Sequence, residues 1–176
     1  HLSTILDDFS RYIVHCELCK GMKAEDVMRS VDNAMVKARI GTKAPPKILS
    51  DNGSCYISKD LKSFLTDKYE IKQIHGKPAH PQTQGKIERY HRSIKSVVSL
   101  QHYFCPEQLN EAIQEYVAFY NKERYHESLN NLTPEDVYLG RGELILKQRD
   151  IIKQNSLRNR RIAYENNKLF SQNTPN

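Results

Sequence analysis

The sequence lacks the features of several protein classes. It has no tryptophan and only four cysteines in 176 residues. No second Cys-x-x-Cys pair or histidine pair follows Cys16–Cys19 at zinc-finger spacing, so we assign no structural zinc there. Few cysteines without a signal peptide before them are typical of reduced thiols in the cytosol. We therefore expect a cytoplasmic protein.

Long apolar runs are also missing. No stretch approaches the roughly 20 apolar residues that a membrane span requires, so the sequence predicts no membrane partner. The formal net charge is +6. Residues 141–176 carry most of this excess, with eight Lys or Arg against three Asp or Glu. This balance favours an anionic partner.

The length and the charge distribution predict two parts. We expect residues 1–140 to form one domain and residues 141–176 to form a basic, partly helical or disordered C-terminal extension. Within that extension only Leu144–Ile152 has a weak helical pattern.

The body of the chain alternates between strand-like and helix-like segments, which predicts α/β layers. The expected strands are His1–Leu6, Tyr12–Leu18, Lys47–Ser50 and Glu70–Ile74. The expected helices are Lys23–Arg39, Ser58–Lys68, Gln84–Gln101 and Pro106–Arg124, with a further helix start at Thr133–Asp136. Ser58 is the expected N-cap of its helix. The segment His75–Gln84 has the composition of an ordered but mobile loop.

Two acidic residues stand where an acid is unexpected. Asp51 directly follows the apolar strand Lys47–Ser50, and Glu88 lies among basic residues of a predicted helix. Carboxylates that converge from separate elements are what metal-assisted phosphoryl transfer needs, so we expect the two to hold a divalent cation against a phosphodiester. The alternative is that Asp51 serves a turn and Glu88 pairs with Arg92 one helical turn later.

Other polar residues have a simpler interpretation. Asp7 and Asp8 resemble a catalytic dyad, but Asp is also typical of turns, and we favour a hairpin turn. His75, His80 and His91 lack a partner histidine four residues away, so we interpret them as loop or surface residues rather than metal ligands.

Three motifs in order closely resemble the catalytic core of retroviral-type integrases and bacterial insertion-sequence transposases. They are S-D-N-G-S at Ser50–Ser54, H-P-Q-T-Q-G-K-I-E-R at His80–Arg89 and Y-N-K-E-R-Y-H-E-S-L-N-N-L-T-P at Tyr120–Pro134. The segment Ile5–Val14 fits the second and third strands of that core. The resemblance covers about Leu2–Gly142. It implies an α/β, ribonuclease H-like mixed sheet flanked by helices, N-terminally truncated and followed by a basic helical extension.

The resemblance also implies an Asp-Asp-Glu triad. Asp51 takes the place of the second acid and Glu88 that of the third. Both would be metal ligands for Mg²⁺ or Mn²⁺, with two ions in the complete site. The family's first aspartate lies on the strand before His1, so we expect this fragment to bind metal weakly and to be inactive. The residues implied to lie near DNA are Asn52, Gln82, Gln84, Gly85, Arg92 and Lys95.

The resulting functional hypothesis is a metal-dependent polynucleotidyl transferase core for DNA integration or transposition. Its partners would be the element ends and target DNA, bound by a homo-oligomer. One alternative is a non-catalytic, nucleic-acid-binding remnant of a transposase. A ribonuclease H acting on RNA–DNA hybrids shares the fold and metals, but the segments His75–Gln84 and Tyr120–Pro134 fit transposases better.

Overall fold

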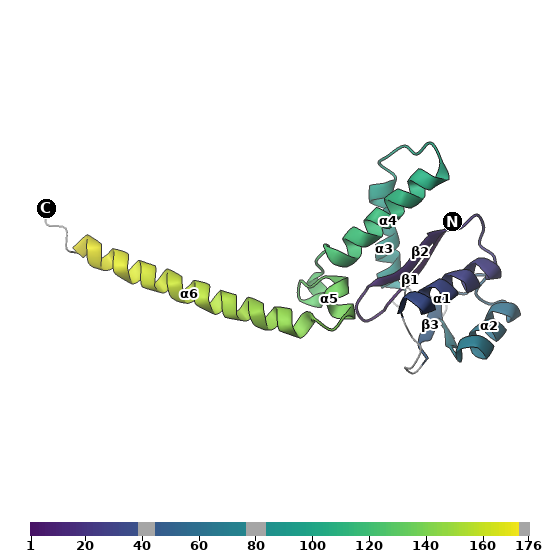
Figure 1. Ribbon diagram of the computed structural model, residues 1–176, viewed down its shortest axis with the longest axis horizontal. Coiled ribbons are helices and arrows are strands. Elements are labelled where there is room, and N and C mark those ends of the chain that lie inside the picture. The colour runs from purple at the N-terminus through teal and green to yellow at the C-terminus, as the bar shows by residue number, and fades with distance from the viewer. Residues whose placement is uncertain (39–44, 77–83, 173–176) are drawn as a thin grey trace. The chain divides into compact units, whose positions relative to one another are not determined.

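The computed structural model describes residues 1–38, 45–76 and 84–172. The chain forms two compact units, His1–Tyr138 and Leu139–Asn176 (Figure 1). The first unit contains β1 (Leu2–Leu6), β2 (Ile13–Leu18), α1 (Ala24–Ala38), β3 (Lys47–Ser50), α2 (Lys59–Tyr69), β4 (Lys72–His75), α3 (Gly85–Val98), α4 (Pro106–Lys122), η2 (Glu127–Leu129) and α5 (Pro134–Tyr138). The second contains α6 (Gly142–Gln172).

Strands β1 and β2 form an antiparallel hairpin, as the sequence predicts. Leu2 pairs with Leu18, and the register shifts between Ile5 and Leu6. The Asp7 carboxylate accepts hydrogen bonds from the backbone N–H and the hydroxyl of Ser10, at 2.8 and 2.6 Å. Asp7 therefore closes the turn, which confirms the turn interpretation for this residue.

Strands β3 and β4 form a separate parallel pair, from Lys47 opposite Lys72 to Ser50 opposite His75. The sequence predicted a mixed sheet, and the described residues contain both an antiparallel and a parallel strand pair, which form two separate sheets. Within the part of the chain that is described, no strand pairs with the second edge of β1 or of β3.

Helices cover the β1–β2 hairpin from two sides. In Figure 1 it runs between α1 on one side and α3 and α4 on the other. Side chains alternate along a strand. Leu2 and Leu6 of β1 therefore pack on the cluster built by β2, α3 and α4, while Ile5 packs on the cluster around α1 and α2. Ile48 of β3 packs on this second cluster as well.

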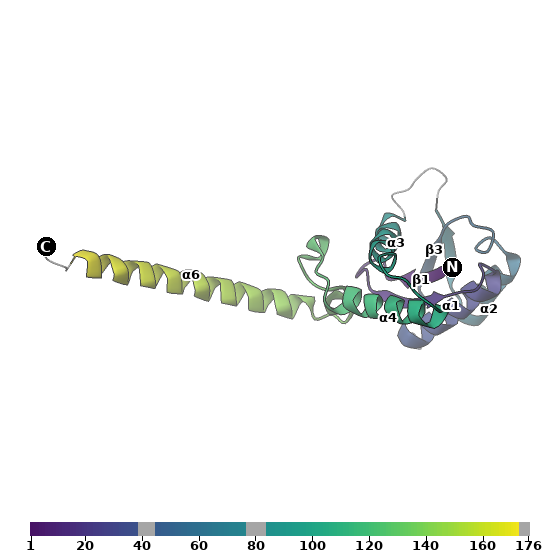
Figure 2. The ribbon, with the colours of Figure 1, turned by 90° about the horizontal axis from the view of Figure 1, so that it is seen from above.

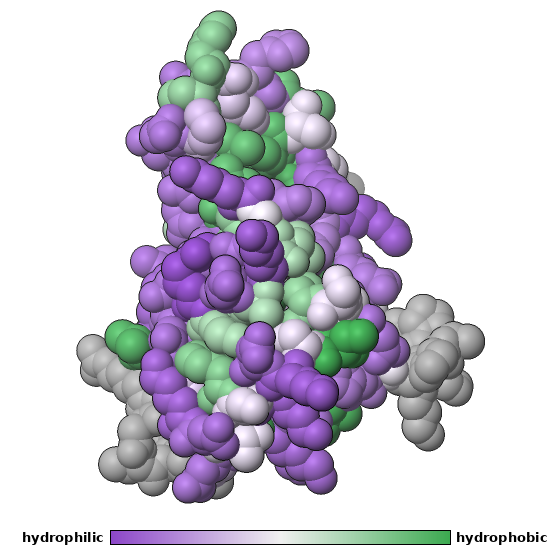
Figure 3. Space-filling model, turned by 90° about the vertical axis from the view of Figure 1, so that its right-hand side faces the viewer, coloured by the Kyte–Doolittle hydropathy of each residue, from purple (hydrophilic) through white to green (hydrophobic). Residues whose placement is uncertain are grey.

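The surface of the first unit is not uniformly polar. Figure 3 shows a band of apolar surface between hydrophilic side chains on one face of the molecule. Leu49 of β3 and Ile74 of β4 contribute apolar surface to the unit, because their side chains are 41% and 40% exposed. The parallel pair is thus incompletely covered, although parallel strands are usually buried on both faces.

Local sequence signals fix several helix ends. The Ser58 hydroxyl accepts a hydrogen bond from the Leu61 N–H at 3.2 Å, which confirms the predicted N-cap of α2. Glu70 ends α2 in the left-handed conformation, with φ of 54°. At α5 the Thr133 hydroxyl accepts from the Asp136 N–H at 3.2 Å, as the Thr-Pro-Glu-Asp pattern predicts.

The second unit is dominated by one helix. Helix α6 has 31 residues, far more than the predicted Leu144–Ile152 (Figure 2). None of the helices that the structure describes is both long enough and apolar enough to span a bilayer.

Candidate active site

Asp51 is the first residue after β3. Ser50 before it is buried, whereas Asp51 itself is exposed. The Asp51 Oδ1 atom accepts a hydrogen bond from the Gly53 N–H at 2.8 Å. A Cβ atom at Gly53 would lie only 2.9 Å from this oxygen, so glycine allows the close approach. The turn holds the carboxylate in place at the end of the strand.

The end of β4 is tied to the same turn. The Gly76 N–H donates to the Ser50 carbonyl at 3.0 Å, and the Asn52 side-chain amide donates to the Gly76 carbonyl at 3.2 Å. His75 Nδ1 lies 3.4 Å from the Asp51 carbonyl oxygen. Asn52 thus connects the Asp51 turn to the neighbouring strand.

The start of α3 reaches this end of the sheet. The Gln84 side-chain amide nitrogen lies 3.5 Å from the position that a Cβ of Gly76 would occupy. The Gln84 carbonyl accepts the Glu88 N–H at 3.0 Å, which places Glu88 in the first turn of α3. These contacts bring the Asp51 turn and the first turn of α3 to the same end of the first unit.

Asp51 and Glu88 both expose their side chains to solvent. Carboxylate oxygens are the ligands that Mg²⁺ and Mn²⁺ prefer, so the two residues present suit such an ion. In residues 1–38, 45–76 and 84–172, no group of three or more His, Cys, Asp or Glu is arranged to hold a metal. The candidate ligand set is therefore a pair of carboxylates.

Lys86 connects α3 to the β1–β2 turn. Its Nζ atom lies 2.8 Å from the Asp8 carboxylate and donates to the Asp8 carbonyl at 2.7 Å. Asp8 thus pairs with a lysine of α3, which agrees with its interpretation as a turn residue.

The residues expected near DNA divide into four groups. Asn52 lies in the Asp51 turn, where its side-chain amide donates to the Gly76 carbonyl. Gln84 and Gly85 form the N-cap and first residue of α3. Arg92 and Lys95 are exposed and follow Glu88 by four and seven residues, so they share its helix face. Gln82 lies outside the described residues, as does His80.

The opposite face of α3 is anchored in the interior. Tyr90 is 1% exposed, and its hydroxyl lies 3.7 Å from Cys16 Sγ. His91 Nε2 lies 3.2 Å from the Thr4 hydroxyl of β1. Burial, and to a lesser degree Lys95, lowers the pKa of His91. These contacts orient α3 so that Glu88 faces solvent.

The sequence did not identify Asn121 as an important residue. Its side chain is buried in α4, where Oδ1 accepts the Ile13 N–H at 2.8 Å and Nδ2 donates to the Ile13 carbonyl at 3.0 Å. Arg124 binds the Ser93 and Tyr116 hydroxyls and lies over the Tyr120 ring. These contacts join Arg124, just after α4, to Ser93 of α3.

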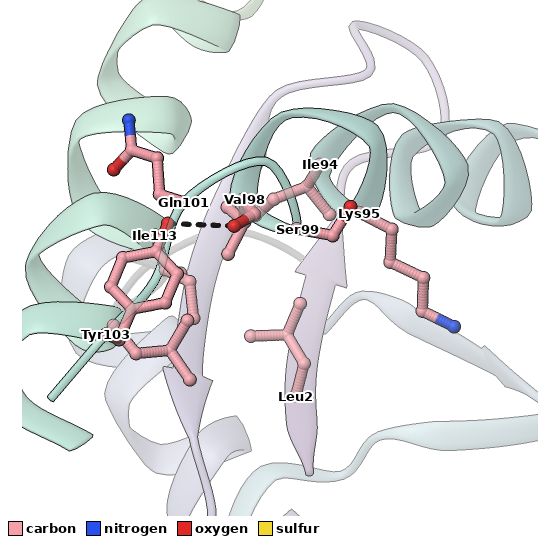
Figure 4. A pocket seen from close by; sticks show the side chains of 9 residues that line it. Leu2, Ile94, Lys95, Val98, Ser99, Gln101, Tyr103 and Ile113 are labelled. Atoms are coloured by element: carbon pink, nitrogen blue, oxygen red, sulfur yellow. Dashed lines mark hydrogen bonds between the residues drawn. The ribbon is translucent and has the colours of Figure 1, made fainter. Parts of the chain in front are cut away.

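A cavity of about 300 Å³ lies at the other end of α3 (Figure 4). It is lined by Leu2, Ile94, Lys95, Val98, Ser99, Gln101, Tyr103, Leu109 and Ile113. The Tyr103 hydroxyl donates to the Val98 carbonyl at 2.9 Å beside it. Because Glu88 lies in the first turn of α3 and Val98 ends that helix, this apolar cavity is separate from the candidate carboxylates.

Two family models match the chain, both described as integrase core domain. One matches residues 1–81 and the other residues 69–134. A putative integrase of Spiroplasma virus SpV1-C74 is 35% identical over 102 residues, covering 50% of this chain and 28% of that protein. The Gag-Pro-Pol polyprotein of Mason-Pfizer monkey virus is 43% identical over 54 residues, covering 31% of this chain and 3% of the polyprotein. The chain thus spans less than a third of either relative.

Solved structures share the fold. The catalytic core domain of BIV integrase has a TM-score of 0.61 and 21% identity, covering 82% of this chain and 89% of that one. A chain of the simian T-cell lymphotropic virus intasome in complex with PP2A regulatory subunit B56 gamma has a TM-score of 0.65 and 20% identity, covering 78% of this chain and 47% of that one. The HTLV-2 integrase catalytic core in complex with magnesium has a TM-score of 0.61 and 21% identity, covering 78% of this chain and 83% of that one. The predicted α/β, ribonuclease H-like fold is confirmed.

Proposed function

Because the chain belongs to the integrase core domain family, with a core of the retroviral type, we propose that it serves DNA integration or transposition. The proposed reaction is polynucleotidyl transfer, in which water or a 3′-hydroxyl attacks a DNA phosphodiester. The observation that carries this proposal is the set of contacts through Asn52, Gly76 and Gln84, which brings the Asp51 turn to the start of α3.

Asp51 and Glu88 are the proposed ligands of Mg²⁺ or Mn²⁺. When bound, the ion would polarise the phosphodiester and stabilise the charge that develops on the leaving oxygen. The Gly53 N–H fixes one oxygen of Asp51, which limits the orientations of its carboxylate. Glu88 lies in the first turn of α3, next to the helix N-terminus.

DNA is the proposed partner. Arg92 and Lys95 lie on the Glu88 face of α3 and would bind backbone phosphates, while Gln84 and Gly85 would lie beside the DNA at the helix start. Similarity to a chain from an intasome and to a core in a trimeric form supports assembly of several copies on DNA. A cytoplasmic location stays a prediction from the cysteine content.

The third carboxylate of the family's triad would come from a further strand. The edges of β1 and β3 that lack a partner in the described structure offer it a place, because Ile5 and Ile48 pack against one cluster. A strand seated there would pair with both sheets and carry its acid towards Asp51. Without that acid we expect weak metal binding and no strand transfer.

The alternative proposal is binding of nucleic acid without catalysis. The set of two carboxylates favours it, since two ligands hold an ion less firmly than three. The two proposals differ in one property: only a catalytic core requires Asp51 and Glu88 to bind a divalent cation.

The deciding experiment is a titration of the ¹⁵N-labelled protein with Mn²⁺. We expect paramagnetic broadening of the backbone signals around Asp51 and Glu88. In Asp51→Asn or Glu88→Gln, the same broadening should require a Mn²⁺ concentration at least about tenfold higher than in the wild type. The matched controls are Asp60→Asn and Glu107→Gln, which change exposed acids in the first turns of α2 and α4.

Equal broadening in all four variants would contradict the metal site and leave the binding-only proposal. A form of the protein that includes the third acid should show strand transfer with Mg²⁺, and either substitution should abolish it while folding is retained. Retained strand transfer would refute both residue assignments.

A further inference from the structure

Helix α6 exposes many apolar residues. Leu144, Ile151 and Ile152 are 60–67% exposed, and Ile162 is 46% exposed. A helix of 31 residues is about 46 Å long at about 1.5 Å per residue. In globular proteins such a helix gains most of its stability by packing an apolar face against a partner.

The charged and uncharged residues of α6 separate around the helix. With about 3.6 residues per turn, one face holds only apolar and amide side chains. The members of this uncharged face are Leu144, Ile145, Gln148, Ile151, Ile152, Asn155, Asn159, Ile162, Ala163 and Asn166. The other side holds all the Lys, Arg, Asp and Glu residues of α6, together with Leu146, Leu157 and Tyr164.

The uncharged face has the same order of residue types in both directions from the level of Leu157. Asn155 and Asn159 lie two residues before and after that level, and Ile152 and Ile162 lie five before and after it. The next positions outward continue the symmetry: Ile151 matches Ala163, and Gln148 matches Asn166. Each apolar position therefore has an apolar counterpart, and each amide has an amide counterpart.

Such symmetry is what a helix needs to pair with an inverted copy of itself. In an antiparallel helix pair, facing positions lie at equal distances on opposite sides of the two-fold axis. We propose that the uncharged face of α6 binds the same face of a second copy of this chain, antiparallel and centred at the level of Leu157. Isoleucines would then pack against isoleucine or alanine, and amides would hydrogen-bond to amides.

Charge selects the antiparallel orientation. A parallel pair in register would also match residue types, but each edge of the face would then lie beside the opposite edge of the partner, so Lys147 would lie near Arg149. In the antiparallel pair, Lys147 lies within about one helical turn of Glu165 on the same edge. Opposed helix dipoles favour this orientation too. Arg158 lies beside its own copy in the antiparallel pair, but this one repulsion is set against two Lys147–Glu165 attractions.

The amides set the register. A slip of seven residues would place Ile152 opposite Asn155, which would leave the amide without a hydrogen-bond partner in the interface. A single polar residue in a helix seam is known to fix register in this way. The face thus encodes one preferred alignment.

The first test compares two lysine substitutions in the full chain by analytical ultracentrifugation. Ile152→Lys changes the uncharged face, and Leu157→Lys changes an exposed apolar residue on the other side with the same added charge. We expect the wild type and Leu157→Lys to dimerise equally, and Ile152→Lys to dimerise at least about tenfold more weakly. Circular dichroism checks that both variants keep their helix content.

Equal dimerisation of the two variants would overturn the proposal, and so would a wild type that stays monomeric. A third outcome is that Ile152→Lys has the same molar mass in solution as the wild type but binds DNA differently. Nucleic acid rather than a second copy would then occupy the face, and the proposal would be wrong.

The second test fixes orientation without relying on disruption. Ile152→Cys and Ile162→Cys are made separately in a Cys105→Ser background, because the other three cysteines are buried. We expect a disulfide only when the two variants are mixed, since in each variant alone the thiols are about 15 Å apart along the axis. Cross-linking of Ile152→Cys with itself would show a parallel pair, and no cross-link in the mixture would also overturn the proposal.

Discussion

The side chain of Asn121 in α4 makes the two backbone hydrogen bonds with Ile13 of β2 that a neighbouring strand would otherwise make. Its amide satisfies both the N–H and the carbonyl of that residue, at 2.8 and 3.0 Å, across 108 positions of sequence. This pair joins the helix layer to the hairpin, so its loss has consequences for the whole first unit.

We predict that Asn121→Ala lowers the free energy of unfolding by about 2–3 kcal/mol, because two buried backbone groups of Ile13 lose their partner. Urea denaturation followed by circular dichroism measures the change. Asn110→Ala, at an exposed position of the same helix, is the control and should change stability by less than about 0.5 kcal/mol. Equal effects of the two substitutions would contradict the role of Asn121.

Acid should destabilise the fold through His126. Burial and the nearby charges of Arg11 and Arg124 lower the pKa of His126 to about 4. Its Nε2 atom is buried and has no hydrogen-bond partner among the described residues. Because the unfolded chain takes up this proton near pH 6.5, stability is full above that pH and declines towards pH 4. Burial lowers the pKa of His15 and His91 as well, which adds to the decline.

The measurement is urea denaturation between pH 7.5 and pH 4.5. We expect His126→Gln to make stability less dependent on pH than in the wild type. An NMR titration that found His126 charging near pH 6.5 in the folded protein would contradict the prediction.

The two glycines beside the candidate carboxylates should respond differently to alanine. In Gly53→Ala the new Cβ would crowd Asp51 Oδ1, so the carboxylate must move and Mn²⁺ binding should weaken at least about threefold. Gly85→Ala meets no atom within 4 Å and should keep metal binding, with stability unchanged or raised by up to about 1 kcal/mol. Unchanged Mn²⁺ affinity in Gly53→Ala would argue against a role for the Asp51 turn.

DNA binding should depend on the exposed basic face of α3. We expect Arg92→Ala and Lys95→Ala each to weaken binding to any DNA duplex. Each should also reduce the slope of the logarithm of the binding constant against the logarithm of the salt concentration by about one. Fluorescence anisotropy across a range of salt concentrations measures both. Lys59→Ala, at an exposed position of α2, is the control. A salt dependence equal to the wild type in both α3 variants would exclude phosphate contacts there.

Local signals explain what the sequence predicted well. The strand Lys47–Ser50 and the cap at Ser58 depend on neighbouring residues, and both were located correctly. Asp51 stands out because an acid follows an apolar strand. Its convergence with Glu88 on a metal stays a prediction.

Long-range features escaped the sequence. Asn121 looks like an ordinary polar residue of α4, and only the distant Ile13 gives it a role. Which distant strands pair with one another is likewise not visible in local patterns. The length of α6 was missed because Asn155 and Asn159, weak helix formers, interrupt its apolar pattern.

The length of α6 would also act as a spacer. The helix starts at Gly142, only four residues after the first unit ends at Tyr138. In an inverted pair the two Gly142 residues would stand about 45 Å apart, at opposite ends of the rod. Dimerisation would then hold the attachment points of two cores at a fixed distance instead of bringing them together.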